Sequence, residues 1–302
     1  MLGDKRQMRK RLSYEISEIV PYINWLYFFH AWGLSGKPLA EKEKMRQEAL
    51  RMLASWEGTY HTHGIFSLLQ ACGDGDDILV YLRDGDFPPG EETTKIASPI
   101  REKMMRIPML RQQRDVVDGQ PNLCLADYLI PASLHRGRDL IGLFCATVDG
   151  MIPEAYRNDD YQSMLAQTLC DRLAEGTAER MHEEVRRHYW GYAPDEHLTM
   201  PQLLLEEYQG IRPAVGYPSI PDTSVNFVLN EILGMQDVGI RLTETGMMTP
   251  HASVSGFMFA HPKARYFEVG KVGEDQLRDY ARRRGIPLET MKKFLLSSLL
   301  RK

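Results

Sequence analysis

The chain has 302 residues, of which 43% are hydrophobic and 26% are charged, and its formal net charge is −4. This length is ample for a buried core, and the composition is typical of a soluble globular protein. The mild negative charge excludes the basic footprint of a nucleic-acid-binding protein, and no block of Lys and Arg indicates a membrane surface.

The first 13 residues are charged and lack an apolar core, so we expect a flexible or helical lead-in rather than a signal peptide. No apolar run is long enough to span a bilayer. The four cysteines are dispersed in apolar surroundings without a CxxC pair: Cys72, Cys124, Cys145 and Cys170. We therefore expect buried free thiols in a reducing cytosol, rather than disulfides or zinc ligands.

The first half of the chain predicts two helices followed by strands. Residues 14–29 and 41–56 show helical patterns, and a polar turn at residues 35–38 separates them. Residues 78–82 form an apolar run between two turns rich in glycine and aspartate, which is typical of a strand. The continuous apolar run at residues 139–148 predicts a central strand.

The longest helical pattern covers residues 159–189, where apolar or aromatic residues recur about every four positions. Two aspartates begin it, which suits the helix dipole, and Gly191 ends it. Glu175 lies at the edge of the apolar stripe, where a carboxylate is usually a salt-bridge partner or a surface residue.

Shorter elements follow. Residues 201–208 predict a helix with a capping box formed by Thr199 and Gln202, and Asp222 caps another helix that ends at Gly234. Residues 254–260 and 266–272 alternate as two strands, and helices are expected at 274–284 and from Pro287 onward. We expect one α+β domain over residues 1–302, with a largely antiparallel sheet and helices to one side.

Residues 210–218 have the features of a ligand-binding loop. Two prolines stiffen the segment, and Arg212 offers a planar fork that suits a carboxylate. Gly216 permits a close backbone approach to a ligand, and Tyr217 adds a flat face with a polar tip. Such a set suits an amino acid joined to an aromatic ring system. The alternative is a structural loop with one surface arginine.

Other motifs carry weaker signals. No GxGxxG follows a strand, and no GxSxG or Cys/His pair indicates a nucleophile. Residues 73–77 lack the spaced ligands of a calcium loop, so they predict a hairpin turn. His61 and His63 lack a nearby third metal ligand in the sequence, so no metal site is expected.

Several stretches occur in a characteristic order: Tyr189-Trp190-Gly191-Tyr192, Tyr208-Gln209-Gly210, Leu242-Thr243-Glu244 and His261-Pro262. In this order they resemble the C-terminal activation domain of cobalamin-dependent methionine synthase, which binds S-adenosylmethionine. The resemblance is dense over residues 159–284 and thinner before them. It implies a single C-shaped α+β domain with a twisted, largely antiparallel sheet flanked by helices.

The resemblance also implies a ligand groove. In the family, the glutamate that matches Glu175 faces bound S-adenosylmethionine, where a carboxylate opposes the sulfonium and α-ammonium charges. The other groove residues implied are Arg212, Ala214, Gly216, Tyr217 and Tyr266. Asn24 stands where the family usually has an aspartate that contacts the amino end of the ligand, and an amide supplies no countercharge.

Two further positions concern a partner. Asp171 matches a family aspartate near the displaced cobalt-ligating histidine, so we expect it to face the cobalamin-carrying partner. His251 stands where the family usually has a small residue, which is either an adaptation to a different partner or a loop substitution.

The resemblance therefore implies a cytoplasmic module that binds S-adenosylmethionine and supports reductive methylation of cob(II)alamin, restoring methylcobalamin. The cobalamin is expected on a separate methionine synthase protein acting in trans, because this chain has no DxHxxG signature of cobalamin binding. The electron is expected to come from a flavodoxin-like donor. Such a module is a component of a methyltransferase system, without catalytic or metal-binding residues of its own. The alternatives are a non-catalytic S-adenosylmethionine sensor or capping module for a corrinoid protein, and a scaffold whose groove has decayed.

Overall fold

The computed structural model describes residues 7–83, 102–114, 119 and 121–300. At its centre is a six-stranded sheet in which every strand pair is antiparallel. Its strands are β1 (Met8–Glu15), β2 (His61–Asp74), β3 (Asp77–Arg83), β4 (Glu102–Pro108), β5 (Asp139–Val148) and β8 (Ser253–Met258). A separate pair is formed by β6 (Arg241–Leu242) and β7 (Met248–Thr249).

The sheet is organised on β2. Along one edge β2 pairs with β5, from Thr62 opposite Val148 to Ala71 opposite Asp139. Along the other edge, β1 covers the first half of β2 and β3 covers the second half. The β2–β3 connection is a tight hairpin in which Gly75 has a φ of +61°, as predicted for residues 73–77.

Helices cover both faces of this sheet. On one face, Ala178 and Met181 of α5 (Asp160–Glu184) pack in a cluster with Phe66 and Phe144. On the opposite face, α7 (Val225–Leu233) joins a cluster that contains Ile65 and Ile141. The prediction of helices to one side was therefore wrong. Strands buried on both faces are almost continuously apolar, so the unbroken apolar run at residues 139–148 was a signal for two covered faces.

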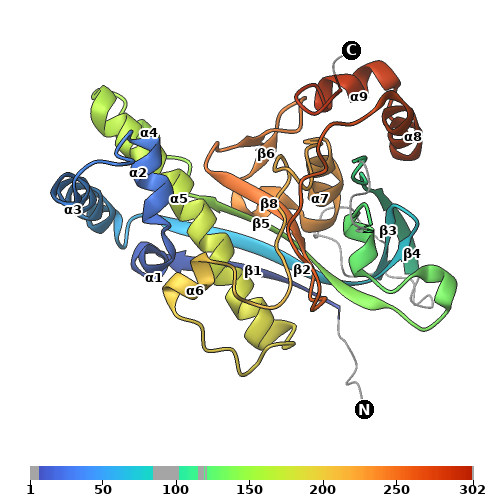
Figure 1. Cartoon of the computed structure of the whole chain (residues 1–302). Helices are drawn as coiled ribbons and strands as arrows, with labels where there is room; N and C mark the ends of the chain where they lie inside the picture. The colour runs from blue at the N-terminus through green and yellow to red at the C-terminus, as the bar shows by residue number, and fades with distance from the viewer. Residues whose placement is uncertain (1–6, 84–101, 115–118, 120, 301–302) are drawn as a thin grey trace, which may run out of the picture.

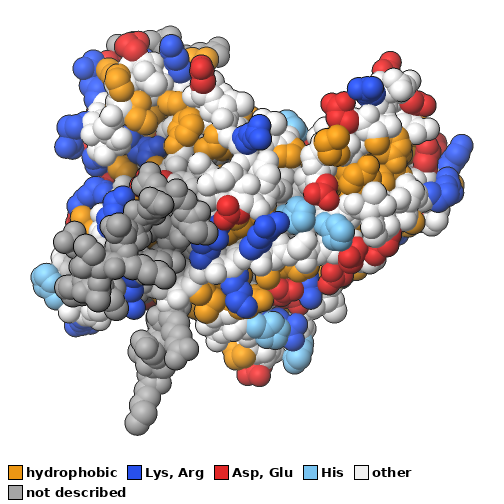
Figure 2. All heavy atoms as spheres, turned by 180° about the vertical axis from the view of Figure 1, so that it is seen from behind, with side chains coloured by type: hydrophobic (Ala, Val, Ile, Leu, Met, Phe, Trp, Pro, Cys, Tyr) orange, Lys and Arg blue, Asp and Glu red, His pale blue; other side chains and the backbone are white. Residues whose placement is uncertain are grey.

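Two groups of helices stand at opposite ends of the sheet (Figure 1). One group holds α2 (Trp25–Ala31) and α3 (Leu39–Trp56), and the other holds α8 (Glu274–Arg284) and α9 (Leu288–Phe294). Seen from behind, the two ends project on either side of a notch (Figure 2), as expected of a C-shaped domain. The short helices are α1 (Ile16–Ile19), α4 (Ile152–Ala155) and α6 (Met200–Leu204). No described helix combines the length and apolarity that a membrane crossing requires.

Most of the predicted elements are confirmed. They correspond to α3, β3, β5, α5, α6, α7, β8, α8 and α9, with boundaries shifted by a few residues. The capping box at Thr199 is present, since its backbone N–H donates to Gln202 Oε1 at 3.0 Å. The four cysteines are buried free thiols, as expected.

The helix predicted at residues 14–29 was wrong at its start and in its middle. Tyr14 belongs to β1, and the chain leaves the helical path between α1 and α2, where Asn24 caps α2 by accepting from the Leu26 N–H at 3.1 Å. The strand Met8–Glu15 also replaces part of the lead-in expected for residues 1–13, of which residues 1–6 lie outside the described ranges. Charged residues on this edge strand interrupt the alternation of apolar and polar residues that would predict a strand.

Residues 266–272 do not form the predicted strand. The segment is irregular, with a φ of +78° at Gly270, and is held by scattered contacts: Ser219 Oγ donates to the Phe267 carbonyl, and the Val269 N–H donates to the Pro218 carbonyl at 3.0 Å. Alternation predicts an extended backbone, but it does not predict whether a ladder partner is present.

The segment at residues 211–215 runs antiparallel along the free edge of β8. Ile211 and Phe259 exchange backbone hydrogen bonds of 3.0 and 2.9 Å, and the Phe257 N–H donates to the Pro213 carbonyl at 3.0 Å. Gly256 makes this approach possible, because a Cβ there would lie 2.1 Å from the Pro213 oxygen. The position of Arg212 therefore depends on a glycine in the neighbouring strand.

Gly256→Ala should destabilise the protein by about 1–3 kcal/mol, because the new methyl group forces residues 213–214 away from β8. Chemical denaturation measures the loss. Gly64→Ala is the matched control in β2, where the nearest atom to a new Cβ is the flexible Met181 Sδ at 3.0 Å. An equal or larger loss in the control would contradict the account of Gly256.

Candidate functional site

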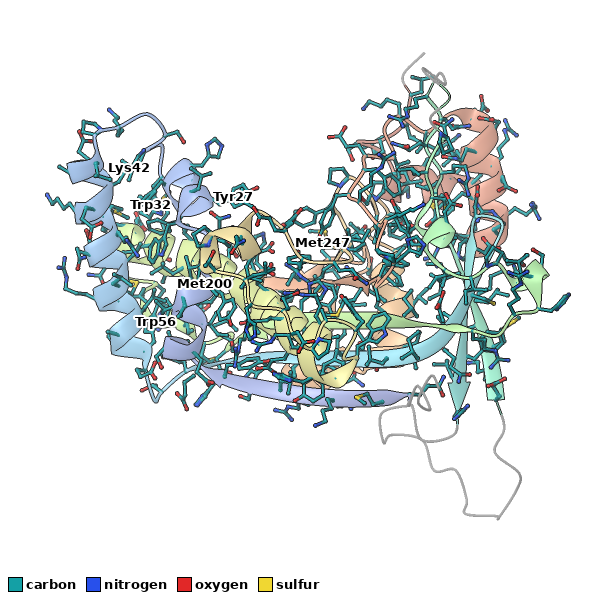
Figure 3. The ribbon with its side chains drawn as sticks, turned by 60° about the horizontal axis from the view of Figure 1, so that its bottom comes forward. Tyr27, Trp32, Lys42, Trp56, Met200 and Met247 are labelled. Atoms are coloured by element: carbon teal, nitrogen blue, oxygen red, sulfur yellow. The ribbon has the colours of Figure 1, made fainter. Side chains whose placement is uncertain are left out.

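Two adjoining cavities form one groove between α2, α5, α6 and the 211–217 segment. The first, the α2 lobe, has a volume of about 490 Å³ and is lined by residues of α2, α5 and α6. The second, the Tyr266 lobe, has a volume of about 390 Å³ and is lined by residues 212–214, 217–219 and 266–268. The residues that line both lobes are Tyr27, Glu175, Glu206, Arg212 and Tyr217. Tyr27 faces Met247 across the hollow of the molecule (Figure 3).

The structure brings nearly all of the predicted site residues to this groove. Asn24 and Asp171 line the α2 lobe, Ala214 and Tyr266 line the Tyr266 lobe, and Glu175, Arg212 and Tyr217 line both. Gly216 lies next to the groove but lines neither lobe. Its φ of +88° serves a turn in which its N–H donates to the Ile220 carbonyl at 2.8 Å. Gly216 therefore forms a turn in this structure, and the close ligand approach expected there stays a prediction.

Arg212 is the deepest cation of the groove. Its side chain is only 10% exposed, and its Nη2 donates to Glu179 Oε2 at 3.0 Å. Burial disfavours the charged form, but the negative charge of Glu179 raises the pKa of Arg212 above its ordinary value, so the guanidinium stays charged. Arg212 Nε and Glu179 Oε1 are buried without a hydrogen-bond partner among the described residues.

Tyr266 fixes the backbone at Arg212. Its hydroxyl accepts a hydrogen bond from the Arg212 N–H at 2.9 Å and lies 3.4 Å from the hydroxyl of Tyr208. Burial raises the pKa of Tyr266 and that of Tyr208, so both phenols remain protonated at neutral pH. Tyr266 therefore joins the 266–272 segment to the Arg212 segment.

Tyr217 bridges the two walls of the groove. Its hydroxyl donates to Glu175 Oε1 at 2.6 Å, linking the 211–217 segment to α5. Burial and the charge of Glu175 raise the pKa of Tyr217. The residue is 52% exposed, so part of its surface remains open to a ligand or a partner.

At the far end of the α2 lobe, Asp171 is already engaged within the chain. His251 Nδ1 lies 3.2 Å from Asp171 Oδ1, and Gln167 Nε2 donates to the same oxygen at 3.1 Å. The His251 side chain is 76% exposed, so this contact can exchange with a contact to another molecule.

A buried polar layer lies behind the groove on α5. His182 is fully buried, and both of its ring nitrogens lack a hydrogen-bond partner among the described residues. Its ring packs edge-on against Tyr208, with ring centroids 4.9 Å apart. Burial, with the charges of Arg186 and Arg212, lowers the pKa of His182 well below 6.5. The imidazole is therefore neutral, under the influence of two guanidinium charges.

Sequence reasoning missed three residues of the groove. Glu179 lies one helical turn from Glu175, so its position on the same face of α5 was a usable signal. Tyr27 follows Asn24 at the start of α2, and its spacing in the sequence does not indicate that it lines a groove. Glu206 is recognisable only from its backbone, which has a φ of +58°.

His61 and His63 each contact a carboxylate. His61 pairs with Glu15 and His63 pairs with Asp149, each at 3.0 Å. Among the residues that the structure describes, no group of three or more His, Cys, Asp or Glu side chains is arranged to hold a metal ion.

Comparison with known proteins identifies both a family model and solved structures that match this chain. Residues 15–285 match the family model described as "Vitamin B12 dependent methionine synthase, activation domain". The fold also matches "Crystal Structure of the MetH Reactivation Domain bound to AdoHcy" with a TM-score of 0.85 and 33% sequence identity. That alignment covers 98% of this chain and 92% of the other.

The buried state of His182 predicts a pH dependence of stability. Its pKa in the folded protein is well below the ordinary value of 6.5, so below this pH the unfolded chain binds more protons and stability falls as pH falls. Below pH 6.5, His182 should lower the free energy of unfolding by about 1.4 kcal/mol for each pH unit, and His182→Leu should abolish this dependence. Urea unfolding at several pH values measures the difference from wild type. The exposed His197→Leu is the control, and identical pH slopes for wild type and His182→Leu would contradict the assignment.

Proposed function

Because the chain belongs to the family of activation domains of vitamin B12-dependent methionine synthase, we propose that its groove binds S-adenosylmethionine and presents the methyl group to a cobalamin. The observation that carries this proposal is the position of Arg212. It is a nearly buried guanidinium, placed where both lobes of the groove meet. A cation in this position suits the carboxylate of an amino-acid ligand.

The charges and the size of the groove fit this ligand. S-adenosylmethionine carries a carboxylate, an ammonium, a sulfonium and a neutral adenosine. In the α2 lobe, carboxylates outnumber guanidinium groups by four to two, which suits a ligand with two positive centres. The volumes of about 490 and 390 Å³ fall within the usual range for small-molecule sites. The buried Arg212 Nε and Glu179 Oε1 also leave hydrogen-bonding capacity that none of the described residues uses.

The residues of this chain act by binding and positioning. Arg212 would hold the ligand carboxylate, Glu175 would face a positive centre, and Tyr217 and Tyr266 would offer aromatic faces beside Ala214. Asn24 and Asp171 would contact the ligand or the partner at the α2 end. Gly216 would hold the turn that places Tyr217. None of these side chains is proposed as a general acid or base.

The reaction supported is reductive methylation. One electron from an external donor and the methyl cation of S-adenosylmethionine convert cob(II)alamin to methylcobalamin, and S-adenosylhomocysteine is released. The family match is to an activation domain and occupies residues 15–285 of this chain, which supports a corrinoid held by other sequence. We place it on a separate methionine synthase protein that docks over the groove, with a flavodoxin-like protein as the electron donor.

A second candidate is a non-catalytic S-adenosylmethionine sensor or capping module for a corrinoid protein. The contact between Asp171 and His251 favours it. Asp171 is the aspartate expected to face the partner, and here it already has a partner within the chain. Both candidates require the ligand to bind in the groove, so a transfer experiment is needed to separate them.

Mixing the protein with a cob(II)alamin-loaded methionine synthase fragment, a reductant and S-adenosylmethionine should yield methylcobalamin, visible in the absorption spectrum. One S-adenosylhomocysteine should appear for each methylcobalamin formed. Omitting the protein is the control. Association with the corrinoid protein without methyl transfer would favour the sensor, and absence of association would reject the partnership.

Replacing Arg212 alone would leave Glu179 charged and nearly buried, which by itself destabilises the fold. The double variant Arg212→Gln, Glu179→Gln avoids this. It should weaken S-adenosylmethionine binding about 30- to 150-fold, since a charge-assisted contact contributes roughly 2–3 kcal/mol. Calorimetry with 5′-methylthioadenosine, which lacks the amino-acid part, should show little change. An equal loss for both ligands would remove Arg212 from the carboxylate site.

A further inference from the structure

Glu206 is an anomaly of the backbone at the groove wall. Helix α6 ends with two hydrogen bonds, from the Glu206 N–H to the Leu203 carbonyl and from the Glu207 N–H to the Gln202 carbonyl, both 3.0 Å. This is a Schellman ending, in which the left-handed position is usually occupied by glycine. Here that position is Glu206, with a φ of +58°. A side chain in this conformation is strained by roughly 1–2 kcal/mol.

The Glu206 side chain gains no hydrogen bond or ion pair within the described parts of the chain in return for this strain. The Glu206 carboxylate forms no hydrogen bond or ion pair with another described residue, although it lines both lobes of the groove. The other carboxylates of the α2 lobe all have such partners: Glu179 binds Arg212, Glu175 binds Tyr217, and Asp171 contacts His251. Glu206 is thus the carboxylate of this lobe that remains available to a ligand.

Glu206 is exposed as a residue, and its carboxyl group is electrostatically coupled to Arg212. Burial raises the pKa of its carboxyl group, Arg212 lowers it and Glu179 raises it. An α-amino acid carries its ammonium and its carboxylate on one carbon atom, so the groups that recognise them must be neighbours. Asn24, on the α2 side, is uncharged, and its amide oxygen already caps α2.

We propose that Glu206 binds the α-ammonium group of the amino-acid ligand, next to the carboxylate site at Arg212. This inference rests on the proposed function. It makes Glu206 a residue by which the groove distinguishes ligands with an amino-acid part from ligands without one. It also accounts for a glutamate at a position where glycine would be more stable. Glu175 is then left to the sulfonium side of the ligand.

The test compares three ligands by calorimetry: S-adenosylmethionine, S-adenosylhomocysteine, which keeps the ammonium but not the sulfonium charge, and 5′-methylthioadenosine, which has neither. Glu206→Gln should weaken the first two about 10- to 100-fold, as expected for the loss of a charge-assisted hydrogen bond. The affinity for 5′-methylthioadenosine should change less than about twofold. Glu207→Gln is the matched control, since this adjacent glutamate lines neither lobe.

A second variant separates binding from folding. Glu206→Gly should lose affinity as Glu206→Gln does, yet raise the melting temperature by about 2 °C, because glycine accepts the left-handed conformation without strain. A merely structural residue would not show this opposition between affinity and stability.

Three results would overturn the proposal. A loss for S-adenosylmethionine alone would place Glu206 at the sulfonium instead. Equal changes for all three ligands, or none, would remove it from the site while leaving the proposed function intact. Failure of the wild-type protein to bind either amino-acid ligand would reject the proposed function, and this inference with it.

Discussion

The ion pair between Arg212 and Glu179 is the interaction on which the groove depends. Removing two charges from water costs several kcal/mol, and their attraction offsets that cost only when the geometry is well fixed. Here Glu179 is fixed by α5, and Arg212 by backbone hydrogen bonds to β8 and to the Tyr266 hydroxyl. A pair of apolar side chains would stabilise such a position at least as well. The retained charge is therefore better explained by recognition of a ligand than by stability.

The groove is assembled from elements that are distant in sequence, and their mutual contacts make it rigid. The 211–215 segment is held to β8 by a close approach at Gly256, and Tyr217 connects it to α5 through Glu175. The exposed surface around the groove is different in character: Tyr27 and Leu205 are 60% and 71% exposed. A rigid, polar interior with exposed apolar residues at its edge suits a site that is covered by another protein after the ligand binds.

The sequence predicted the long helix α5, the central strand β5 and the Arg212 segment, because each depends on local periodicity or on proline and glycine placement. The prediction of a helix at Tyr14 was wrong, because Tyr14 lies in an edge strand whose charged residues hide the alternation. The prediction of helices on one face only was wrong because α7 covers the other face of the sheet. Tyr266 was placed in the groove by family resemblance although its segment is not a strand. Glu206 could not be predicted, since a positive φ at a glutamate follows from how α6 ends rather than from any motif.

The most direct test of this account is a crystal structure of the protein with S-adenosylhomocysteine. We expect the amino-acid part of the ligand to lie between Arg212 and Glu206, and its adenosine to lie in the Tyr266 lobe beside Tyr217 and Tyr266. A larger cavity of about 710 Å³ lies beyond the 266–271 segment and is lined by Gln112, Gln113 and Lys271 among others. Ligand density in that cavity, with the Arg212–Glu179 groove empty, would contradict the account.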